Sequence, residues 1–367
     1  MGLNCGIVGL PNVGKSTIFS ALSNAPAEAA NYPFCTINPN IGIVSVPDER
    51  LDKIVKLIPT EKVIPATVEF VDIAGLVKGA SKGEGLGNRF LASIREVGVL
   101  VHVVRCFENP DIIHVSDSVD PARDIEIINI ELALADLETV EKRIERYERF
   151  GRLGGEMAKE AKTLLPLLTK IKEALSNNIA ARNLNLDEDE KNSLHDLHLI
   201  TLKPLIYVCN IDEEAIANGN DYTKIVADIA KKEGAEALNV CGKIEAEIAL
   251  LSSDEQKEFL EAVGLKESGL VQLIRSGYKT LNLSTFFTVG SDEDRAWTIK
   301  SGTKAPQAAR TIHTDFEKGF IRAEVYHCDH LFEYGSEQKV REVGKLRLEG
   351  KEYVVRDGDI IRFRFNV

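Results

Sequence analysis

The sequence feature that most constrains the fold is a glycine-rich stretch near the amino terminus, residues 9–16. It reads Gly-Leu-Pro-Asn-Val-Gly-Lys-Ser and satisfies the pattern G-x4-G-K-[ST]. A short apolar run, residues 3–8, precedes it, and a helical pattern, residues 16–22, follows it. Because a strand, a phosphate-type loop and a helix open an α/β unit, the sequence predicts a P-loop nucleotide-binding core. A glycine-rich turn without a ligand is the alternative, and it leaves Lys15 unexplained.

The residues of this loop suit the phosphates of a nucleotide. Glycines let the backbone wrap closely, so that successive N–H groups and the helix N-terminus face an anion. We expect Lys15 to neutralise the β- and γ-phosphates, Ser16 to ligate Mg²⁺ through its hydroxyl, and Thr17 to lie near the α-phosphate. The predicted contacts of the loop are Asn12, Val13, Gly14, Lys15, Ser16 and Thr17.

Two further motifs have the spacing expected of a P-loop GTPase-like core. Asp72 closes the apolar run 67–71 and begins Asp-Ile-Ala-Gly, so we expect its carboxylate to hold Mg²⁺ through water. Gly75, in the same motif, can offer its backbone N–H to the γ-phosphate. Thr36 is the candidate switch threonine that closes on Mg²⁺ when a γ-phosphate is present. A solvated loop threonine is the alternative.

The place where such proteins read the base is altered here. After the apolar run 205–209, the usual Asn-Lys-x-Asp is replaced by Asn210, Ile211, Asp212 and Glu213. The usual aspartate accepts two hydrogen bonds from guanine, and the longer Glu213 displaces that fit, which weakens guanine discrimination. Ile211 can still cover the purine face. Backbone contacts to the base rim are expected from a later pair of residues, Cys241 and Gly242.

The pattern of apolar residues in the rest of the sequence divides the chain into three parts. The runs 67–71, 97–104 and 205–209 are continuously apolar, as in parallel strands buried on both faces. A three-four apolar spacing predicts two helices joined by the glycine-rich turn 151–155, forming a projecting antiparallel hairpin; a pair of ordinary core helices is the alternative. Its expected seam is Ile127, Ile130, Leu134, Leu137 and Ile144 against Ala161, Leu164, Leu168, Ile171 and Leu175.

From residue 281 onward, short alternating runs predict a small mixed β domain. The expected architecture is therefore an α/β fold: a P-loop NTPase core of the Ras-like type, an inserted helical hairpin, and a small C-terminal domain. The predicted boundaries are residues 1–124 with 200–280 for the nucleotide-binding domain, 125–199 for the insertion, and 281–367 for the C-terminal domain.

Taken together, the motifs at residues 9–16, 31–36, 72–80 and 210–213 resemble those of the YchF family, the Obg-like ribosome-binding ATPases. Tail segments at residues 303–307, 319–324 and 356–359 are similar to the β-grasp-like TGS domain of that family. The resemblance spans the whole chain. It implies a translation-factor-related P-loop fold, preference for ATP over GTP, association with the ribosome, and links to stress responses. Asn12 matches an asparagine of potassium-dependent relatives, which adds K⁺ as a candidate cofactor.

Hydrolysis is expected to be slow. Leu76 stands where many switch GTPases place a glutamine that orients water, so we expect an intrinsic rate on the order of 10⁻⁴ to 10⁻² per second. His102 lies in the run 97–104 and is expected to be structural. His114 is a candidate for contacting the γ-phosphate, with a solvated loop histidine as the alternative. The predicted catalytic residues are Lys15, Gly75 and His114.

Composition limits the partners. The 367 residues hold 45 Lys+Arg against 57 Asp+Glu, a net charge of −12, so general binding to DNA or to an anionic membrane is not expected. Contacts with ribosomal RNA therefore need a local basic patch, or a balanced solvated sheet stands there instead. The candidate patch is Arg341, Lys345, Arg347, Lys351, Arg356, Arg362 and Arg364, interleaved with Tyr353 and Phe363.

Location and function follow as expectations. No apolar run reaches the length of a membrane helix, and the 6 cysteines form no C-x-x-C pair, so we expect a cytoplasmic protein. The favoured function is a slow ATP-hydrolysing switch that acts with Mg²⁺ on the ribosome, through its RNA and protein, in translation or stress response. The alternatives are a GTPase of the same architecture, and a regulator in which nucleotide only gates a protein-binding surface.

Overall fold

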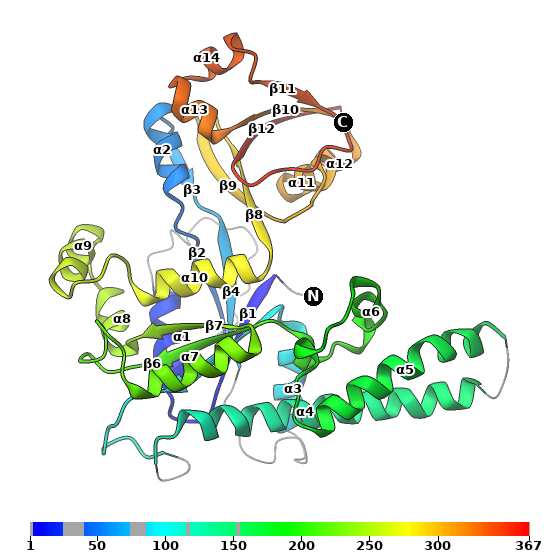
Figure 1. Ribbon diagram of the computed structural model, residues 1–367. Coiled ribbons are helices and arrows are strands. Elements are labelled where there is room, and N and C mark those ends of the chain that lie inside the picture. The colour runs from blue at the N-terminus through cyan, green and yellow to red at the C-terminus, as the bar shows by residue number, and fades with distance from the viewer. Residues whose placement is uncertain (1–2, 25–39, 74–85, 115–117, 152–154, 367) are drawn as a thin grey trace. The chain divides into compact units, whose positions relative to one another are not determined.

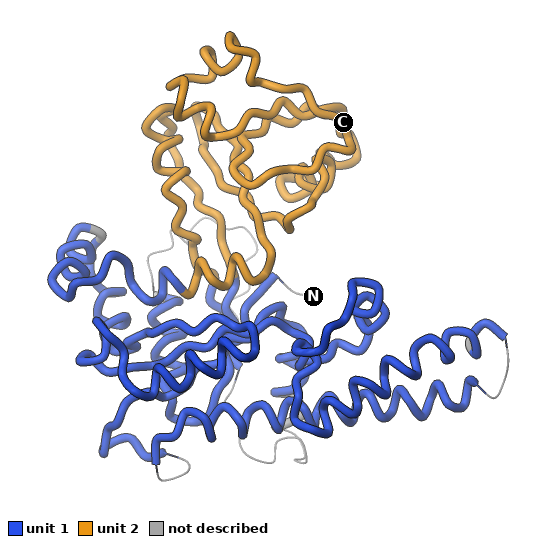
Figure 2. The backbone as a smooth tube through the Cα atoms, in the orientation of Figure 1, with its two compact units in different colours: residues 1–42, 69–272 blue, residues 43–68, 273–367 orange. Residues whose placement is uncertain are grey.

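The computed structural model describes residues 3–24, 40–73, 86–114, 118–151 and 155–366. The chain forms two compact units, residues 1–42 with 69–272, and residues 43–68 with 273–367 (Figure 2). Each unit is built on a six-stranded sheet. The segment 43–68 therefore groups with the C-terminal part of the chain, which the sequence did not lead us to expect.

The sheet of the first unit has the strand order β2-β4-β1-β5-β6-β7. Its strands are β1 (Asn4–Val8), β2 (Ile41–Ser45), β4 (Thr67–Asp72), β5 (Val99–Arg105), β6 (Leu205–Asn210) and β7 (Glu236–Val240). Strand β1 pairs in parallel with β4 and β5, and β6 pairs in parallel with β5 and β7. Every residue of β5 and β6 is buried, as predicted for strands that are covered on both faces. The same prediction is wrong for β4, because Glu69 is exposed.

Helices pack around this sheet or project from it (Figure 1). They are α1 (Lys15–Asn24), α3 (Leu86–Glu96), α4 (Pro121–Gly151), α5 (Glu156–Ser176), α6 (Glu188–Ser193), α7 (Asp221–Glu233), α8 (Gly242–Ile248) and α9 (Ser253–Ala262), with α10 (Gly269–Thr280) leading into the second unit. Short 3₁₀ helices are η3 (Ala181–Asn183), η4 (His195–Leu197) and η5 (Ile200–Leu202). None of the described helices combines the length and apolarity that crossing a membrane requires.

Helices α4 and α5 form the predicted hairpin, which extends away from the sheet (Figure 1). Its second half is held by an apolar cluster that includes Val140, Tyr147 and Leu168. The predicted seam is correct there but wrong in the first half of α4, where Ile130 and Leu134 are exposed. In that half the buried residues belong to a different stripe because α4 packs against β5 and α7.

The sheet of the second unit has the order β11-β10-β12-β8-β9-β3 and is mixed, as predicted. Its strands are β3 (Lys62–Ile64), β8 (Leu283–Thr288), β9 (Glu293–Lys300), β10 (Phe320–His327), β11 (Arg347–Glu349) and β12 (Asp359–Phe365). Its helices are α2 (Glu49–Leu57), α11 (Ala305–Ile312), α12 (Thr314–Lys318), α13 (Cys328–Tyr334) and α14 (Glu337–Glu342). Strand β3 extends the sheet by pairing in parallel with β9.

The second unit also holds the segment 43–68 through a charged anchor. Arg50 on α2 pairs with Asp48 at 2.7 Å and with Asp357 at 2.6 Å. The other carboxylate oxygen of Asp357 accepts a hydrogen bond from the backbone N–H of Thr285 at 2.7 Å. One arginine therefore links α2 to a residue 307 positions later in the sequence.

The aromatic residues of the candidate basic patch are placed differently from the expectation. Phe363 is buried in the core, and Tyr353 packs against that core and donates to Asp359 at 2.6 Å. Arg347 donates to the hydroxyl of Tyr353 at 3.0 Å. Neither aromatic ring is therefore interleaved with exposed arginines, and that part of the prediction is wrong.

Candidate functional site

The loop between β1 and α1 has a backbone shape that requires glycine at two positions. Gly9 has φ 152° and Gly14 has φ 95°, values that side-chain-bearing residues rarely adopt. A Cβ at Gly9 would lie 2.5 Å from the carbonyl oxygen of Val103, and a Cβ at Gly14 would lie 2.1 Å from Nδ2 of Asn210. The spacing of the motif therefore reflects close approaches to β5 and β6, which shape the loop before any ligand arrives.

Lys15 lies folded back over this loop. Its side chain is buried, and Nζ donates a hydrogen bond to the carbonyl oxygen of Leu10 at 2.7 Å. Burial lowers the pKa of Lys15, and the nearby Asp72 carboxylate opposes that shift. Ser16 and Thr17 are exposed at the N-terminus of α1. The loop thus offers a positive charge, free hydroxyls and helix N–H groups to an anion.

Asp72 ends β4, near enough to Lys15 for each charge to affect the pKa of the other. Its Oδ1 atom is buried and has no hydrogen-bond partner within the described part of the chain. Burial raises the pKa of Asp72, and the charge of Lys15 opposes the rise. A buried carboxylate oxygen without a partner is costly unless a cation or its water shell satisfies it, so Asp72 and the exposed hydroxyl of Ser16 fit Mg²⁺, which prefers oxygen ligands. The other predicted ligand, Thr36, and Gly75 lie outside the described residues.

A pocket of about 770 Å³ opens beside this loop. Predicted residues that line it are Asn12, Gly14, Thr17, Asn210, Ile211, Glu213, Cys241 and Gly242. The structure therefore brings the loop after β1, the loop after β6 and the start of α8 to one cavity, of a size typical for small-molecule sites. Lys15 and Ser16 are not among its lining residues, and the side chain of Val13 is buried in the core.

Asn210 joins two walls of the pocket. Its Nδ2 donates to the carbonyl oxygen of Val13 at 2.9 Å, and its Oδ1 accepts from the N–H of Gly242 at 3.1 Å. Both bonds are buried. The side-chain amide thus fixes the phosphate loop relative to the residues expected at the base rim.

Glu213 points toward Lys243 at the rim of the pocket. Its Oε1 accepts from Nζ of Lys243 at 2.6 Å, and both side chains are largely exposed. Ile211 is buried on the neighbouring wall, where burial also raises the pKa of the Cys241 thiol. Glu213 is thus paired with Lys243, and it differs in this from the free carboxylate that would accept hydrogen bonds from guanine.

One wall of the pocket was missed by the sequence analysis. Phe107, Glu108, Asn109 and Ile112 line it, all from the loop after β5. Arg105 holds this loop: its buried guanidinium donates to the carbonyl oxygens of Phe107, Ile112 and Asn109 at 3.1, 3.0 and 3.1 Å. An arginine directly after an apolar strand was the available indication, because a buried guanidinium needs acceptors from a nearby loop.

His114 and His102, the two histidines considered in the sequence analysis, have different surroundings. His114 is buried, and its Nε2 lies 2.8 Å from Oδ2 of Asp124, so the expectation of a solvated loop histidine is wrong. Its catalytic role stays a prediction; the neighbouring Ile113 accepts a hydrogen bond from Asn12 at 3.2 Å, which places this loop beside the phosphate loop. His102 is buried in β5, 5.4 Å from the ring of Tyr207, as expected for a structural residue.

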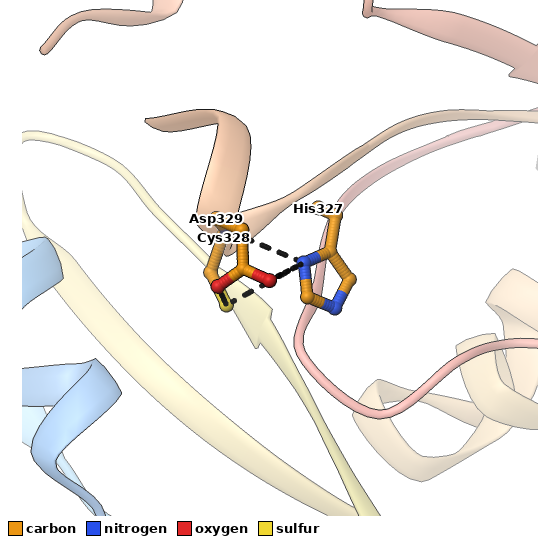
Figure 3. Close-up of side chains that lie close together, drawn as sticks. All are labelled: His327, Cys328 and Asp329. Carbon is orange, nitrogen blue, oxygen red and sulfur yellow. Dashed lines mark hydrogen bonds and ion pairs between the residues drawn. The ribbon is translucent and has the colours of Figure 1, made fainter. Parts of the chain in front are cut away.

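Three consecutive residues of the second unit, His327, Cys328 and Asp329, place potential metal ligands close together (Figure 3). However, Nδ1 of His327 accepts from the backbone N–H of Asp329 at 3.3 Å and so caps α13. The other ring nitrogen lies 2.9 Å from the carbonyl oxygen of Asp357, which it can bond only as a donor. Burial also raises the pKa of the Cys328 thiol to about 11. The cluster is therefore explained as a helix cap.

Comparisons with known proteins agree with this fold. A family model described as "50S ribosome-binding GTPase" matches residues 4–143, and a model of the YchF C-terminal domain, described as "protein of unknown function (DUF933)", matches residues 283–366. Among solved structures, the Schizosaccharomyces pombe YchF GTPase has a TM-score of 0.90 and 38% identity, covering 99% of this chain and 97% of that one. A GTP-binding protein from Pyrococcus horikoshii has a TM-score of 0.61 at 20% identity and supports the fold alone.

Full-length relatives are closer in sequence. Proteins named "Ribosome-binding ATPase YchF" are 55% identical in Pasteurella multocida and 54% identical in Escherichia coli O157:H7, each over 367 residues. The Bacillus subtilis protein of the same name is 53% identical over 369 residues. In all three cases the match covers 100% of this chain and 100% of the relative. The chain therefore belongs to the YchF family.

Proposed function

We propose that the chain is a slow ATP-hydrolysing switch that binds ATP with Mg²⁺ and acts on the ribosome in the cytoplasm, regulating translation or a stress response. The observation that carries the proposal combines two features. A buried Lys15 is folded over a loop that needs glycine at two positions, and a buried carboxylate oxygen of Asp72 has no partner among the described residues. The names of the full-length relatives support both ATP and the ribosome as partners.

Each part of the site then has a role. The backbone N–H groups of residues 12–14 bind the β-phosphate, and Lys15 neutralises the β- and γ-phosphates. Ser16, Thr36 and Asp72 would hold Mg²⁺, which supplies charge neutralisation to the β- and γ-oxygens when bound. We assign the γ-phosphate contact to the N–H of Gly75. K⁺ beside Asn12 remains part of the proposal.

His114 is proposed to orient the attacking water. For its ring to turn toward the phosphates, the 2.8 Å hydrogen bond to Asp124 must break. Replacing His114 with alanine should leave ATP affinity unchanged and lower the single-turnover rate severalfold. An unchanged rate would remove this residue from the mechanism.

The base is proposed to be adenine. Adenine presents an acceptor at N1, which a free carboxylate would repel, and the ion pair between Glu213 and Lys243 removes part of that repulsion. Ile211 covers the purine face, Thr17 lies near the α-phosphate, and Cys241 and Gly242 supply backbone contacts to the base rim. We assign nucleotide binding to residues 1–124 and 200–280, and partner contacts to the hairpin 125–199 and the tail 281–367.

A GTPase of the same architecture is the second candidate, because the matching family model and the Schizosaccharomyces pombe structure both carry that word in their descriptions. Isothermal titration of the purified chain with ATP–Mg²⁺, and with GTP–Mg²⁺ in competition, separates the two. The proposal expects ATP to bind more tightly than GTP. A clear preference for GTP would replace it. Sedimentation with purified ribosomes in ATP, ADP or no nucleotide tests the second half, and the proposal expects nucleotide-dependent binding.

A further inference from the structure

Arg105, the last residue of β5, has one of the largest fully buried side chains among the described residues. Its guanidinium donates to the backbone carbonyl oxygens of Phe107, Asn109 and Ile112 and forms no ion pair within the described part of the chain. Because arginine is not deprotonated in proteins, a positive charge lies buried behind this loop. Burying a charge without a counter-ion is costly, and an apolar side chain would fill the space at less cost. Packing alone therefore gives no reason for an arginine here.

The residues whose carbonyl groups Arg105 binds also form one wall of the nucleotide pocket. Phe107, Asn109 and Ile112 all line it. The guanidinium carbon of Arg105 lies 4.7 Å from the centroid of the Phe107 ring, which is within the range of a cation–π interaction. Three carbonyl oxygens that could accept hydrogen bonds from a ligand are instead bound by the guanidinium. The position of this wall therefore depends on Arg105.

Side chains from other elements hold the two ends of the loop. Asn220, which caps α7, donates from Nδ2 to the carbonyl oxygen of Cys106 at 2.7 Å. At the other end, Asn12 of the phosphate loop donates to the carbonyl oxygen of Ile113 at 3.2 Å. Between these two points Arg105 binds the backbone three times. The loop is thus held in one conformation before any nucleotide enters the pocket.

We propose that Arg105 is a positioning residue for the selection between purine nucleotides. A fixed wall rejects a base whose polar groups it cannot match, whereas a movable wall adapts to either base. Loss of the guanidinium should therefore reduce the difference in affinity between ATP and GTP. The inference rests on the proposed function in so far as that function assigns this pocket to the base.

The test variant is Arg105→Lys in the full-length chain, because lysine keeps the charge but lacks the planar group that binds three carbonyl oxygens at once. The matched control is Arg182→Lys. Arg182 also donates to backbone carbonyl oxygens, those of Thr201 and Lys203 at 3.2 and 3.0 Å, but it does not line the pocket. Urea unfolding establishes that each variant is folded, and titration calorimetry with ATP–Mg²⁺ and GTP–Mg²⁺ gives the ratio of the two affinities.

Arg105→Lys should bring the ATP-to-GTP affinity ratio closer to one by at least about fivefold, whereas Arg182→Lys should leave it within about twofold of its original value. A merely structural arginine would lower the stability, or lower both affinities by the same factor, and would leave the ratio unchanged. That result for Arg105→Lys overturns the inference, and so does an equal change of the ratio in the control.

Asn220→Asp replaces the test variant if Arg105→Lys does not fold. Aspartate still accepts the hydrogen bond from the backbone N–H of Thr223 that caps α7, but it cannot donate to the carbonyl oxygen of Cys106. The start of the same loop is therefore loosened while the helix cap stays. This variant should move the affinity ratio toward one by more than Arg182→Lys does, and an unchanged ratio overturns the inference.

The proposed function and this inference fail through different results. If the unmodified chain prefers GTP, the assignment of ATP as the ligand fails, but the comparison of Arg105→Lys with its control still shows whether selection depends on Arg105. If the unmodified chain prefers ATP and Arg105→Lys keeps that preference, the inference alone fails. An affinity ratio close to one in the unmodified chain also overturns the inference, because there is then no selection for Arg105 to maintain.

Discussion

Replacing Asn210 with alanine tests whether the two halves of the nucleotide site depend on one amide. The substitution removes the bonds to Val13 and Gly242, at 2.9 and 3.1 Å. A buried backbone group left unpaired costs about 1–3 kcal/mol. The carbonyl of Val13 is buried among core residues, so it falls at the upper end of that range. Gly242 lines the pocket, so water can enter the space that the Asn210 side chain vacates and reach this N–H, and its cost falls at the lower end. The expected loss of unfolding free energy is about 2–4 kcal/mol.

Part of the lost unfolding free energy should also appear as weaker ATP binding. If half of it reflects a loosened site, ATP affinity falls by about 5- to 30-fold, since about 1.4 kcal/mol corresponds to a factor of ten. Titration calorimetry measures the affinity, and urea unfolding measures the stability. Asn239→Ala is the matched control, because Asn239 is an exposed asparagine on the neighbouring strand β7. We expect it to change both quantities by little.

Two results would refute this reasoning. If Asn210→Ala unfolds at the same urea concentration as the unmodified chain, the two buried bonds are replaced at no cost. If it loses stability but keeps full ATP affinity, Asn210 is structural and does not position the loops for the ligand. Asn210→Asp sharpens the distinction, because a carboxylate still accepts from Gly242 but cannot donate to the carbonyl of Val13.

Three further outcomes follow from the same geometry. Lys15→Met should weaken ATP binding by about 10- to 100-fold, because a charge-assisted hydrogen bond is lost, and should abolish hydrolysis; calorimetry and phosphate release check it. Asp72→Asn should make ATP affinity insensitive to EDTA, whereas the unmodified chain should lose affinity when Mg²⁺ is chelated. Burial lowers the pKa of His102 to about 3, with Arg182 and Lys15 contributing. The unfolded chain therefore takes up a proton near pH 6.5 that the folded chain refuses, and stability should fall by up to about 1.4 kcal/mol per pH unit below that value. Urea unfolding at pH 7.5 and about 5.5 should show a smaller difference for His102→Leu than for the unmodified chain.

The shape of the loop between β1 and α1 was predictable because it requires particular residue types at a fixed spacing. Gly9 and Gly14 approach β5 and β6 too closely for any side chain, and Lys15 must follow directly to reach the same anion. Such constraints act within a few residues of the sequence. The same locality explains why the strands β5 and β6 were found, since a strand buried on both faces keeps a nearly continuous apolar pattern. Within β5 only His102 interrupts it, and Arg105 and Asn210 stand at the strand ends.

The features of the fold and of the site that were not predicted depend on contacts between segments that are distant in the sequence. The buried side chains of α4 follow different stripes in its two halves, because the first half packs against β5 and α7 and the second half packs against α5. A single periodic pattern cannot describe both surroundings. Strand β3 has three residues, and it is recognisable only through its pairing with β9, more than 200 residues away. The loop 107–112 carries no motif, because Arg105 holds it through backbone carbonyls that any sequence supplies.

The residues expected to contact the base depend both on a local motif and on contacts between distant segments. This matters for how the chain would select its purine. The altered motif removes the carboxylate that guanine needs, but the ion pair of Glu213 with Lys243 lies at the exposed rim, where such pairs contribute little. Strong discrimination comes instead from buried polar groups that one base satisfies and another leaves unpaired. A strong preference for ATP would therefore have to arise elsewhere on the walls of the pocket, which Ile211 and the loop held by Arg105 both line. We expect the altered motif to weaken the preference for guanine, and we expect any preference for adenine to come from the packing around Arg105.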